Sequence, residues 1–416
     1  GILALIVALM AFGIIPGLRN DVGKKVTLTV WGVEPSGVIN TLLADYAAIN
    51  KGVQVQYTQL NPETYEADLI DALATSNAPD IAMFHSSWLP KHFQKFIPAP
   101  AEQLNTAALR KLFPRIVEQD FAPDGPVYAL PLHVDTLALF YNQDIFDAKG
   151  VAFPPETWED FQGAVLKLRE LDKRGDLAKP AAAIGGSTRN IAPAADLLTL
   201  LMLQSGTQMV SNDFSRATFA SPEGRSALEF YTQFAYAPAP YYTWNNFLPD
   251  ALESFARGEL AMMFAYAGDR DALKEKNPFL RYAVNPMPQP KDAQQVANIA
   301  SYWGLGVTNK SLNSQAAWNL IFALTTDTNT ATKYLELARR PPALRSLVNT
   351  YLNDPDLGVF AKQALTARSW PQINNTAVTA SFSRMIESVI GGQKDVEQAL
   401  QQSEDEITNL MSRRIR

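Results

Sequence analysis

The chain has 416 residues, of which 47% are hydrophobic and 19% are charged, and its formal net charge at pH 7 is −6. This length favours two domains over one, and a negative charge without a basic stripe argues against nucleic-acid binding, which needs clustered lysine and arginine. The sequence contains no cysteine, which excludes disulfides, thiolate metal sites and cysteine nucleophiles within it.

The first segment, "ILALIVALMAFGIIPGL" at 2–18, runs for 17 residues without a charge and is followed by Arg19. It is longer than most signal-peptide cores and close to the length of a membrane span, and no small-x-small cleavage site follows it. We therefore expect a transmembrane signal-anchor at 1–19 and a linker at 20–25, with the rest of the chain outside the cytoplasmic membrane. A cleaved signal peptide is the alternative, whereas glycine and proline within the segment disfavour a buried core helix.

The next sixty residues alternate between strand and helix patterns. "VTLTVWGV" (26–33) and "VQVQYTQ" (53–59) alternate as half-buried strands do, and "PDIAMF" (79–84) is a short apolar strand. Helical spacing of apolar residues separates them, in "SGVINTLLADYAAIN" and in a segment from Thr64. The order β-α-β-α-β predicts a parallel sheet with helices on both faces.

The rest of the chain continues in α/β style without internal repeats. A helix after Thr157 has a capping-box pattern with Asp160, and "AAAIGG" (181–186) is predicted as a strand that ends in glycines. "YAVNPMPQP" and "ASYWGLGVTN" predict two further strands, and Ser221 caps another helix. From Asp354 onward the pattern is helical.

Motifs for catalysis and phosphate binding do not occur in the sequence. It contains no GxxxxGK[ST] loop, no GxSxG elbow and no HExxH helix. The three histidines, His85, His92 and His133, are too scattered to predict a metal site. We therefore predict a protein without metal or cofactor that is not an enzyme.

The tryptophans favour a carbohydrate site. Trp88 follows "HSS" at a strand end, Trp244 lies in "YYTWNNF", Trp303 lies in "SYWGLG" and Trp370 precedes a proline. Open parallel sheets bind ligands beyond the carboxyl ends of their strands, and flat aromatic faces beside hydroxyl, amide and carboxylate groups suit a sugar. A core position is the alternative for each of the four, and is predicted for the other three tryptophans: Trp31, Trp158 and Trp318.

Seven stretches, in this order, resemble the extracellular solute-binding proteins of ABC importers, in the cluster that includes maltose-binding protein and other sugar-binding lipoproteins. The resemblance spans residues 26 to about 410. The stretches are "VTLTVWG", "APDIAMF", "LALFYNQDIFDAKGVAFPPETWEDF", "SPEGRSALEFY", "FARGELAMMFAY", "SYWGLGVTN" and "AAWNLIFALTT".

The resemblance implies a two-lobe, type II periplasmic-binding-protein-like α/β fold with hinge crossovers and a ligand cleft between the lobes. "PLHVDTLALFYN" resembles the first crossing, "ASYWGLGVTN" the second, and the stretch around 351–354 the third. Lobe I would comprise 26–133 and 304–350, and lobe II would comprise 137–300 and 355–416.

The resemblance also implies site residues. Asp135 falls at the place of a cleft glutamate and would accept sugar hydroxyls. Phe84 replaces a tryptophan, Ser87 an aspartate and Trp88 an arginine, while Gly268 stands where a stacking tryptophan is expected. These departures from maltose-binding protein imply a different ligand. The other residues that we expect to contact the ligand are Thr188, Arg189, Trp244, Tyr266, Trp303 and Trp370.

The function implied is extracytoplasmic capture of a small solute, expected to be a carbohydrate, by a monomer that closes its hinge and delivers the solute to an ABC permease. Many members are anchored by a lipidated cysteine; because this sequence has none, we expect the segment 1–19 to tether it to the membrane. One alternative is a membrane-anchored glycan-acting enzyme, with Asp135 and Asp269 as its carboxylates. The other is a receptor module that senses a ligand without transporting it.

Overall fold

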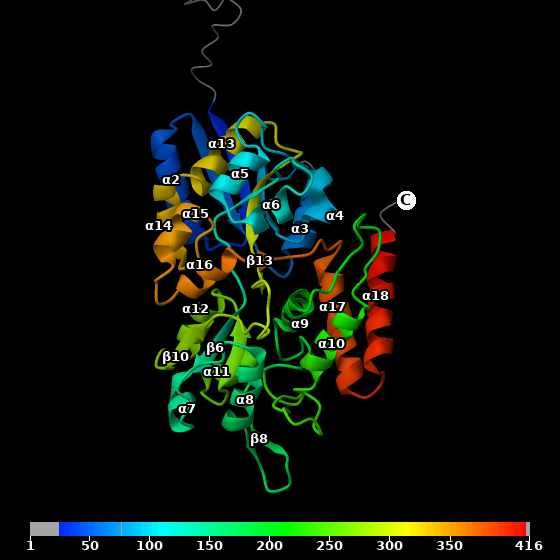
Figure 1. Ribbon diagram of the computed structural model, residues 1–416. Coiled ribbons are helices and arrows are strands. Elements are labelled where there is room, and N and C mark those ends of the chain that lie inside the picture. The colour runs from blue at the N-terminus through cyan, green and yellow to red at the C-terminus, as the bar shows by residue number, and fades with distance from the viewer. Residues whose placement is uncertain (1–24, 76, 413–416) are drawn as a thin grey trace, which may run out of the picture.

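The structure is a computed structural model that describes residues 25–75 and 77–412 and has two lobes, with lobe I above lobe II in Figure 1. The expected signal-anchor at 1–19 and all but the last residue of the expected linker lie outside the described residues. Among the residues that are described, no helix combines the length and apolarity needed to cross a membrane.

Lobe I contains a sheet in the order β2-β1-β3-β12-β4, with β5 paired to β12. Strand β1 pairs in parallel with β2 and β3, as the β-α-β-α-β pattern predicts, and β12 runs antiparallel to β3. The carboxyl ends of β1 and β3 therefore point the same way, toward lobe II (Figure 1). The strands are β1 Val26–Gly32, β2 Val53–Gln59, β3 Ile81–His85, β4 Phe96–Ile97, β5 Leu130–Pro131 and β12 Trp303–Thr308.

Helices flank this sheet, and their buried residues recur at helical spacing. In α2, for example, the buried residues are Ile39, Leu42 and Leu43. The helices of lobe I are α2 Ser36–Ile49, α3 Tyr65–Leu73, α4 Leu89–His92, α5 Thr106–Leu112, α6 Arg115–Phe121, α13 Ser314–Thr325, α14 Thr328–Ala338 and α15 Arg345–Tyr351.

Lobe II is built on a three-stranded antiparallel sheet in the order β10-β6-β9. The strands are β6 Ala138–Asn142, β9 Met262–Ala265 and β10 Tyr282–Asn285. The helices are α7 Gln143–Ala148, α8 Trp158–Leu168, α9 Ala194–Gln204, α10 Pro222–Thr232, α11 Ala251–Ala256, α12 Asp269–Lys276, α16 Gly358–Ala364, α17 Asn375–Ile390 and α18 Val396–Ser412. The capping box predicted at the start of α8 is present, formed by Thr157 and Asp160.

The strand predicted at 181–186 is wrong. Only Ala182 makes a bridge, to Met262 on β9. The backbone N–H groups of Ala181 and Ala182 donate to the Thr243 hydroxyl, at 2.8 and 3.2 Å. The segment is therefore bonded to a side chain at these residues and does not pair with a second strand along its length. The prediction mistook a buried apolar run for a strand.

The buried residues form two separate clusters. One draws on residues within 28–134 and 300–347 and on Ala364 and Ala367, and the other draws on residues within 137–299 and 357–411. Tyr351, in the stretch expected as the third crossing, packs against both clusters. The lobe boundaries expected from the sequence stay predictions. Each lobe has a hydrophobic core of its own, which stabilises that lobe.

The segments that join the lobes are hydrogen-bonded to one another along the seam. The Ser301 N–H donates to the Asp135 carbonyl at 3.0 Å, and the Leu137 N–H donates to the Ile299 carbonyl at 3.1 Å. A third segment joins them where β13 (Ala367–Arg368) pairs in parallel with β11 (Asn298–Ile299) and then leads to α17 (Figure 1). The crossing strands thus form a shared floor between the lobes.

Candidate functional site

A small pocket of about 50 Å³ lies on this floor between the lobes. We call it the interlobe pocket. Lobe I contributes the end of β3, lobe II contributes the starts of α9 and α17, and the crossings supply the rest. Its polar side chains are hydroxyls, amides, an imidazole and a carboxylate, on His85, Ser86, Ser87, Asp196, Ser301, Ser369, Gln372, Asn375 and Thr379; the indole of Trp370 also lines it.

His85 is the central polar group on the lobe I side. Its ring nitrogens Nδ1 and Nε2 lie 2.8 Å from the Ser87 hydroxyl and 2.9 Å from the Ser301 hydroxyl. Burial lowers the pKa of His85 to about 4, so the ring is neutral at physiological pH. A neutral imidazole accepts at one nitrogen and donates at the other, which fixes how the two hydroxyls are oriented toward the pocket.

An aromatic cluster stands beside His85. The Trp88 and Trp303 rings meet edge to face with centroids 5.1 Å apart, and Tyr65 stacks on Trp88 at 6.0 Å. Trp303 also meets the His85 ring edge to face at 5.2 Å. Trp88 is buried whereas Trp303 is partly exposed, so Trp303 offers the more accessible aromatic surface of the two.

On the lobe II side, Asp196 and Tyr266 form a pair. The Tyr266 hydroxyl donates to Asp196 Oδ2 at 2.8 Å, and burial raises the pKa of Asp196. Asp196 keeps its other oxygen as an acceptor on the wall of the interlobe pocket. Thr188 lies apart from this pair, and its hydroxyl donates to the Ser383 hydroxyl in α17 at 2.8 Å. Arg189 is exposed.

Asp135 lies in the first crossing and is buried. Its Oδ1 accepts from the N–H groups of Thr136 (2.8 Å) and Ala267 (3.0 Å), and its Oδ2 accepts from the Gly268 N–H (3.1 Å). Burial nevertheless raises its pKa to about 7. The carboxylate expected to bind sugar hydroxyls is thus largely engaged by backbone, and it fastens the first crossing to the lobe II turn that follows β9.

Two of the expected ligand contacts are placed in hydrophobic cores. Phe84 is fully buried in lobe I, where its ring lies 4.5 Å from that of Phe96. Trp244 is fully buried in lobe II, and its indole N–H donates to Asn190 at 3.1 Å. The structure therefore brings together Ser87, Trp88, Trp303, Tyr266 and Trp370 around the interlobe pocket, and keeps Phe84 and Trp244 away from it.

Sequence reasoning missed several polar residues of the interlobe pocket, among them Asp196, Ser301 and Asn375. Asp196 lies in the first turn of α9, where an acid is ordinary because it favours the helix dipole. Asn375 is the first residue of α17 and follows the N-cap Asn374. His85 is not among the ligand contacts expected from the sequence, although its place at the carboxyl end of β3 is the position where such sheets bind ligands.

A second buried polar cluster lies at the seam, outside the interlobe pocket. Glu34 follows β1, and one of its carboxylate oxygens has no hydrogen-bond partner among the described residues. His133 Nδ1 lies 2.8 Å from the Tyr334 hydroxyl and 3.9 Å from Glu34. Burial raises the pKa of Glu34 and lowers that of His133 to about 3. Both groups are therefore shifted toward their neutral forms.

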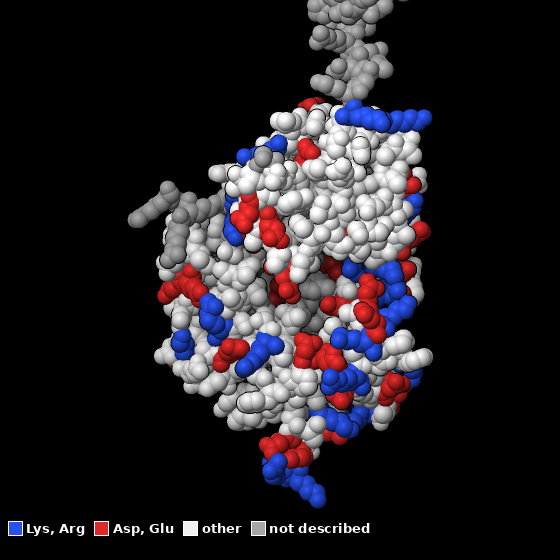
Figure 2. Space-filling model, turned by 180° about the vertical axis from the view of Figure 1, so that it is seen from behind, with Lys and Arg blue, Asp and Glu red and all other residues white. Residues whose placement is uncertain are grey.

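Charged side chains are unevenly distributed over the surface. Seen from behind, they gather on lobe II and along its boundary with lobe I, where the surface is hollowed, while the face of lobe I is mostly uncharged (Figure 2). Two ion pairs between described residues span the boundary: Arg340, which follows α14, lies 3.4 Å from Asp271 in α12, and Arg339 lies 3.9 Å from Asp356 before α16. Because their carboxylates are largely exposed, these pairs contribute little to the relative position of the lobes.

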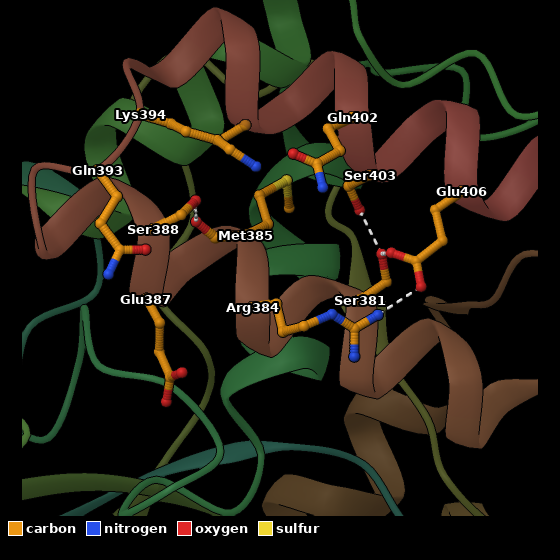
Figure 3. Close-up of a pocket in the computed structure, with 11 residues that line it drawn as sticks. Ser381, Arg384, Met385, Glu387, Ser388, Gln393, Lys394, Gln402, Ser403 and Glu406 are labelled. Carbon is orange, nitrogen blue, oxygen red and sulfur yellow. Dashed lines mark hydrogen bonds and ion pairs between the residues drawn. The ribbon is translucent and has the colours of Figure 1, made fainter.

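A further polar hollow of about 250 Å³ lies between α17 and α18 in lobe II (Figure 3). Some of its side chains bond to one another: Ser381 bonds to Ser403 and Glu406, and Arg384 pairs with Glu406. The lining residues all come from lobe II. This hollow therefore does not have the two-sided construction of the interlobe pocket.

Comparisons with known proteins agree with this architecture. A binding protein of Brucella abortus (strain 2308) is 20% identical over 361 residues, which cover 85% of this chain and 84% of that protein. The cyclic α-maltosyl-1,6-maltose binding protein of Arthrobacter globiformis is 19% identical with a TM-score of 0.79, over 93% of this chain and 99% of that one. The sugar-binding protein of Xanthomonas citri is also 19% identical, with a TM-score of 0.77 over 94% and 98%.

These structures share the two-lobe α/β fold with the present chain. The family model described as bacterial extracellular solute-binding protein matches residues 41–358, which includes most of lobe I, the first two crossings and much of lobe II. The expectation of a solute-binding protein, drawn from short stretches of sequence, is confirmed by this match. The chain belongs to the bacterial extracellular solute-binding protein family.

Proposed function

We propose that the protein captures a carbohydrate between its lobes and delivers it to an ABC permease. The observation that carries this proposal is the composition of the interlobe pocket, in which hydroxyl, amide, imidazole and carboxylate groups from both lobes stand beside the indoles of Trp303 and Trp370. Aromatic faces cover the C–H face of a sugar, and the polar groups bind its hydroxyls. Two of the proteins that share the fold are named as sugar-binding proteins.

Closure of the lobes is the expected mechanism. A pocket of about 50 Å³ holds only about one or two waters, so a sugar is admitted and held while the lobes stand further apart than they do here. Contacts such as that between Trp88 and Asn375 belong to the narrower position described here. A ligand that binds both lobes favours the closed form because it makes contacts there that the open form lacks.

Binding without turnover fits the state of the acidic residues. A glycosidase needs two carboxylates that face the scissile bond. Asp135 accepts from the N–H groups of Ala267 and Gly268, and Asp269 accepts from the N–H of Tyr266 at 2.9 Å. Both carboxylates are thus engaged by the same turn, which favours a capture protein over the glycan-acting enzyme.

The proposal is tested by thermal shift and calorimetry with a panel of mono- and oligosaccharides, and a panel of peptides for comparison. A ligand that binds only the folded state raises the melting temperature. We expect at least one sugar to bind, and Trp303→Ala and Asp196→Asn each to weaken it by about 1–3 kcal/mol. Thr376→Ala, an exposed change in the first turn of α17, is the control. Binding of peptides with no response to any sugar would refute the proposal.

We further propose that the protein acts as a monomer tethered to the outer face of the membrane by residues 1–19. The tether rests on the uncharged run of the sequence at 2–18. Replacing 1–20 by a cleavable signal should release the protein into the medium. Recovery of unaltered native protein from the medium would contradict the tether.

A further inference from the structure

A larger cavity of about 350 Å³ adjoins the interlobe pocket. We call it the outer groove. Ser86, Ser87, Ser369 and Trp370 line both cavities, so one ligand can extend from one into the other. The remaining walls come from the start of α4, from the turn between α6 and β5, from Pro371 and, on the lobe II side, from Phe214.

The walls of the outer groove are mainly carbon. Leu89, Pro90 and Phe93 form one side, and Pro123, Pro126 and Tyr128 form another. This composition differs from that of the interlobe pocket, where most side chains are polar. The two adjoining cavities therefore suit two chemically different parts of one molecule.

Several polar groups of the outer groove are already bonded to protein partners. The Asp120 carboxylate accepts from the Tyr302 hydroxyl at 2.7 Å and from the Ser369 hydroxyl. The Gln119 amide donates to the Ser369 carbonyl at 2.7 Å, and the Ser87 hydroxyl is bonded to His85. The other polar groups of the groove are the Ser86 and Tyr128 hydroxyls and the exposed Asp124 carboxylate, which are few for the several hydroxyls of a sugar ring.

Trp370 stands at the junction of the two cavities. It is 5% exposed, and its indole N–H has no hydrogen-bond partner among the described residues. One ring face packs near Phe382 at 6.4 Å, which fixes the indole in place. A buried donor of this kind calls for an acceptor, and the Trp370 side chain lines both cavities.

Phe214 supplies the lobe II side of the outer groove. It is 56% exposed and has a φ of 54°, in the left-handed region that a phenylalanine rarely adopts. A tight turn holds it there: the Phe214 N–H donates to the Ser211 carbonyl at 2.9 Å, and the Ser215 N–H donates to Asp213 at 3.1 Å. The turn thereby presents an aromatic ring to the apolar wall of lobe I instead of burying it in a core.

We propose that the outer groove binds the apolar aglycone of a glycoside whose sugar occupies the interlobe pocket. This inference rests on the proposed function and narrows its ligand to a glycoside with an aromatic or other flat apolar group. The aglycone lies between Phe214 of lobe II and the apolar side chains of lobe I, and the Trp370 side chain lies where the two parts of the ligand join. Closure of the lobes covers both parts of the ligand together.

The test measures the affinity of the full protein for matched pairs of methyl and phenyl glycosides, each pair with the same sugar and anomer, beside unsubstituted di- and trisaccharides. For the sugar that binds, we expect the phenyl glycoside to bind at least tenfold more tightly than the methyl glycoside. Phe214→Ala should reduce that ratio to threefold or less. Phe247→Ala, which removes a 98% exposed ring elsewhere on lobe II, should leave the ratio at its original value.

Phe214→Gly is the second variant, because glycine readily adopts a positive φ and the turn is kept even if Phe214→Ala lowers the melting temperature. Equal affinities within every pair that binds would overturn the aglycone site and leave the proposed function standing. Tighter binding of trisaccharides than of phenyl glycosides, lost in Phe214→Ala, would show that sugar rings occupy the groove and would also overturn it. Failure of every sugar and glycoside to bind would overturn both proposals.

Discussion

The indole N–H of Trp88 in lobe I donates to the side-chain oxygen of Asn375 in lobe II at 3.1 Å. Trp88 follows β3 and Asn375 begins α17, so this bond joins the two lobes directly rather than through a crossing strand. Gln119 in α6 donates at 2.7 Å to the carbonyl of Ser369, which follows β13 in the segment that leads to α17. The lobes are thus held closed by contacts at the ligand cleft as well as by the hinge.

Replacing Asn375 by alanine should shift the lobes toward the open form. The change removes one hydrogen bond between lobes and leaves the buried Trp88 N–H without its acceptor, at a cost of about 0.5–1.5 kcal/mol to the closed form. Small-angle scattering of the free protein should therefore report a larger radius of gyration. Thr376→Ala, at the exposed neighbouring position, should scatter as the parent does. An unchanged radius in Asn375→Ala would mean that this bond does not hold the lobes together.

The buried Asp120 should make stability depend on pH. Burial raises its pKa to about 7 from an ordinary value of 3.8. Between these values the folded protein holds a proton that the unfolded chain releases, so raising the pH through this window lowers the stability that Asp120 contributes. The stability that Asp120 contributes is fully lost above about pH 7. Each unit of difference between its folded and unfolded pKa corresponds to about 1.4 kcal/mol of unfolding free energy.

Asp120→Asn isolates this effect. Asparagine has similar size and can bond to both Tyr302 and Ser369, so we expect the variant to gain stability relative to the parent as the pH rises from about 4 to 7. Urea midpoints at several pH values measure it. The variant is compared with the parent at each pH, because the buried His85 and His133 have lowered pKa values. Their contribution to stability rises with pH, opposite to that of Asp120, and is common to both proteins. A constant difference between variant and parent would contradict a raised pKa. Asp124→Asn, at the exposed surface, is the control.

Asp135→Ala should lower the free energy of unfolding. The N–H groups of Thr136, Ala267 and Gly268 would lose their acceptor, and each buried donor left without a partner costs about 1–3 kcal/mol. Asp135→Asn keeps one oxygen acceptor and should cost less. Urea unfolding at pH 8, where the parent carboxylate is ionised, measures both. If Asp135→Ala instead kept full stability and weakened sugar binding, the side chain would face the ligand as the sequence predicts.

Two glycine substitutions should have opposite effects on stability. A Cβ on Gly306 in β12 would lie 2.7 Å from the Tyr128 carbonyl oxygen and 2.8 Å from the Phe84 ring, so Gly306→Ala should destabilise lobe I by about 1–3 kcal/mol. In α8, a Cβ on Gly163 meets nothing within 4 Å. Gly163→Ala should therefore stabilise the protein by about 0.5–1 kcal/mol. Thermal unfolding measures both, and a stable Gly306→Ala variant would refute the tight packing around β12.

The elements that the sequence predicted well are those with local signals. Alternation of apolar residues identified β1 and β2, and the capping box at Thr157 identified the start of α8, because each depends on residues close in sequence. The strand expected at 181–186 failed because its backbone pairs with β9 only around Met262, while Ala181 and Ala182 donate to the side chain of Thr243, some sixty residues away. No local pattern encodes that contact.

The candidate site was predicted only in part for the same reason. Trp244 stands among turn residues in the sequence, yet it is buried in lobe II against Gly186 and Asn190. The interlobe pocket joins His85, Asp196 and Asn375, which lie far apart in the chain and meet only where the crossings bring the lobes together. The resemblance gives expected positions for the crossings, but the identity of the residues that meet there depends on the packing of both lobes.

The position of β12 in the lobe I sheet affects how this chain can be made and exported. Strand β12 lies between β3 and β4, yet it begins at Trp303, after most of lobe II has been synthesised. A ribosome-bound chain therefore lacks an inner strand of its own first lobe and cannot complete that sheet. The interleaved connectivity delays completion of lobe I until late in synthesis.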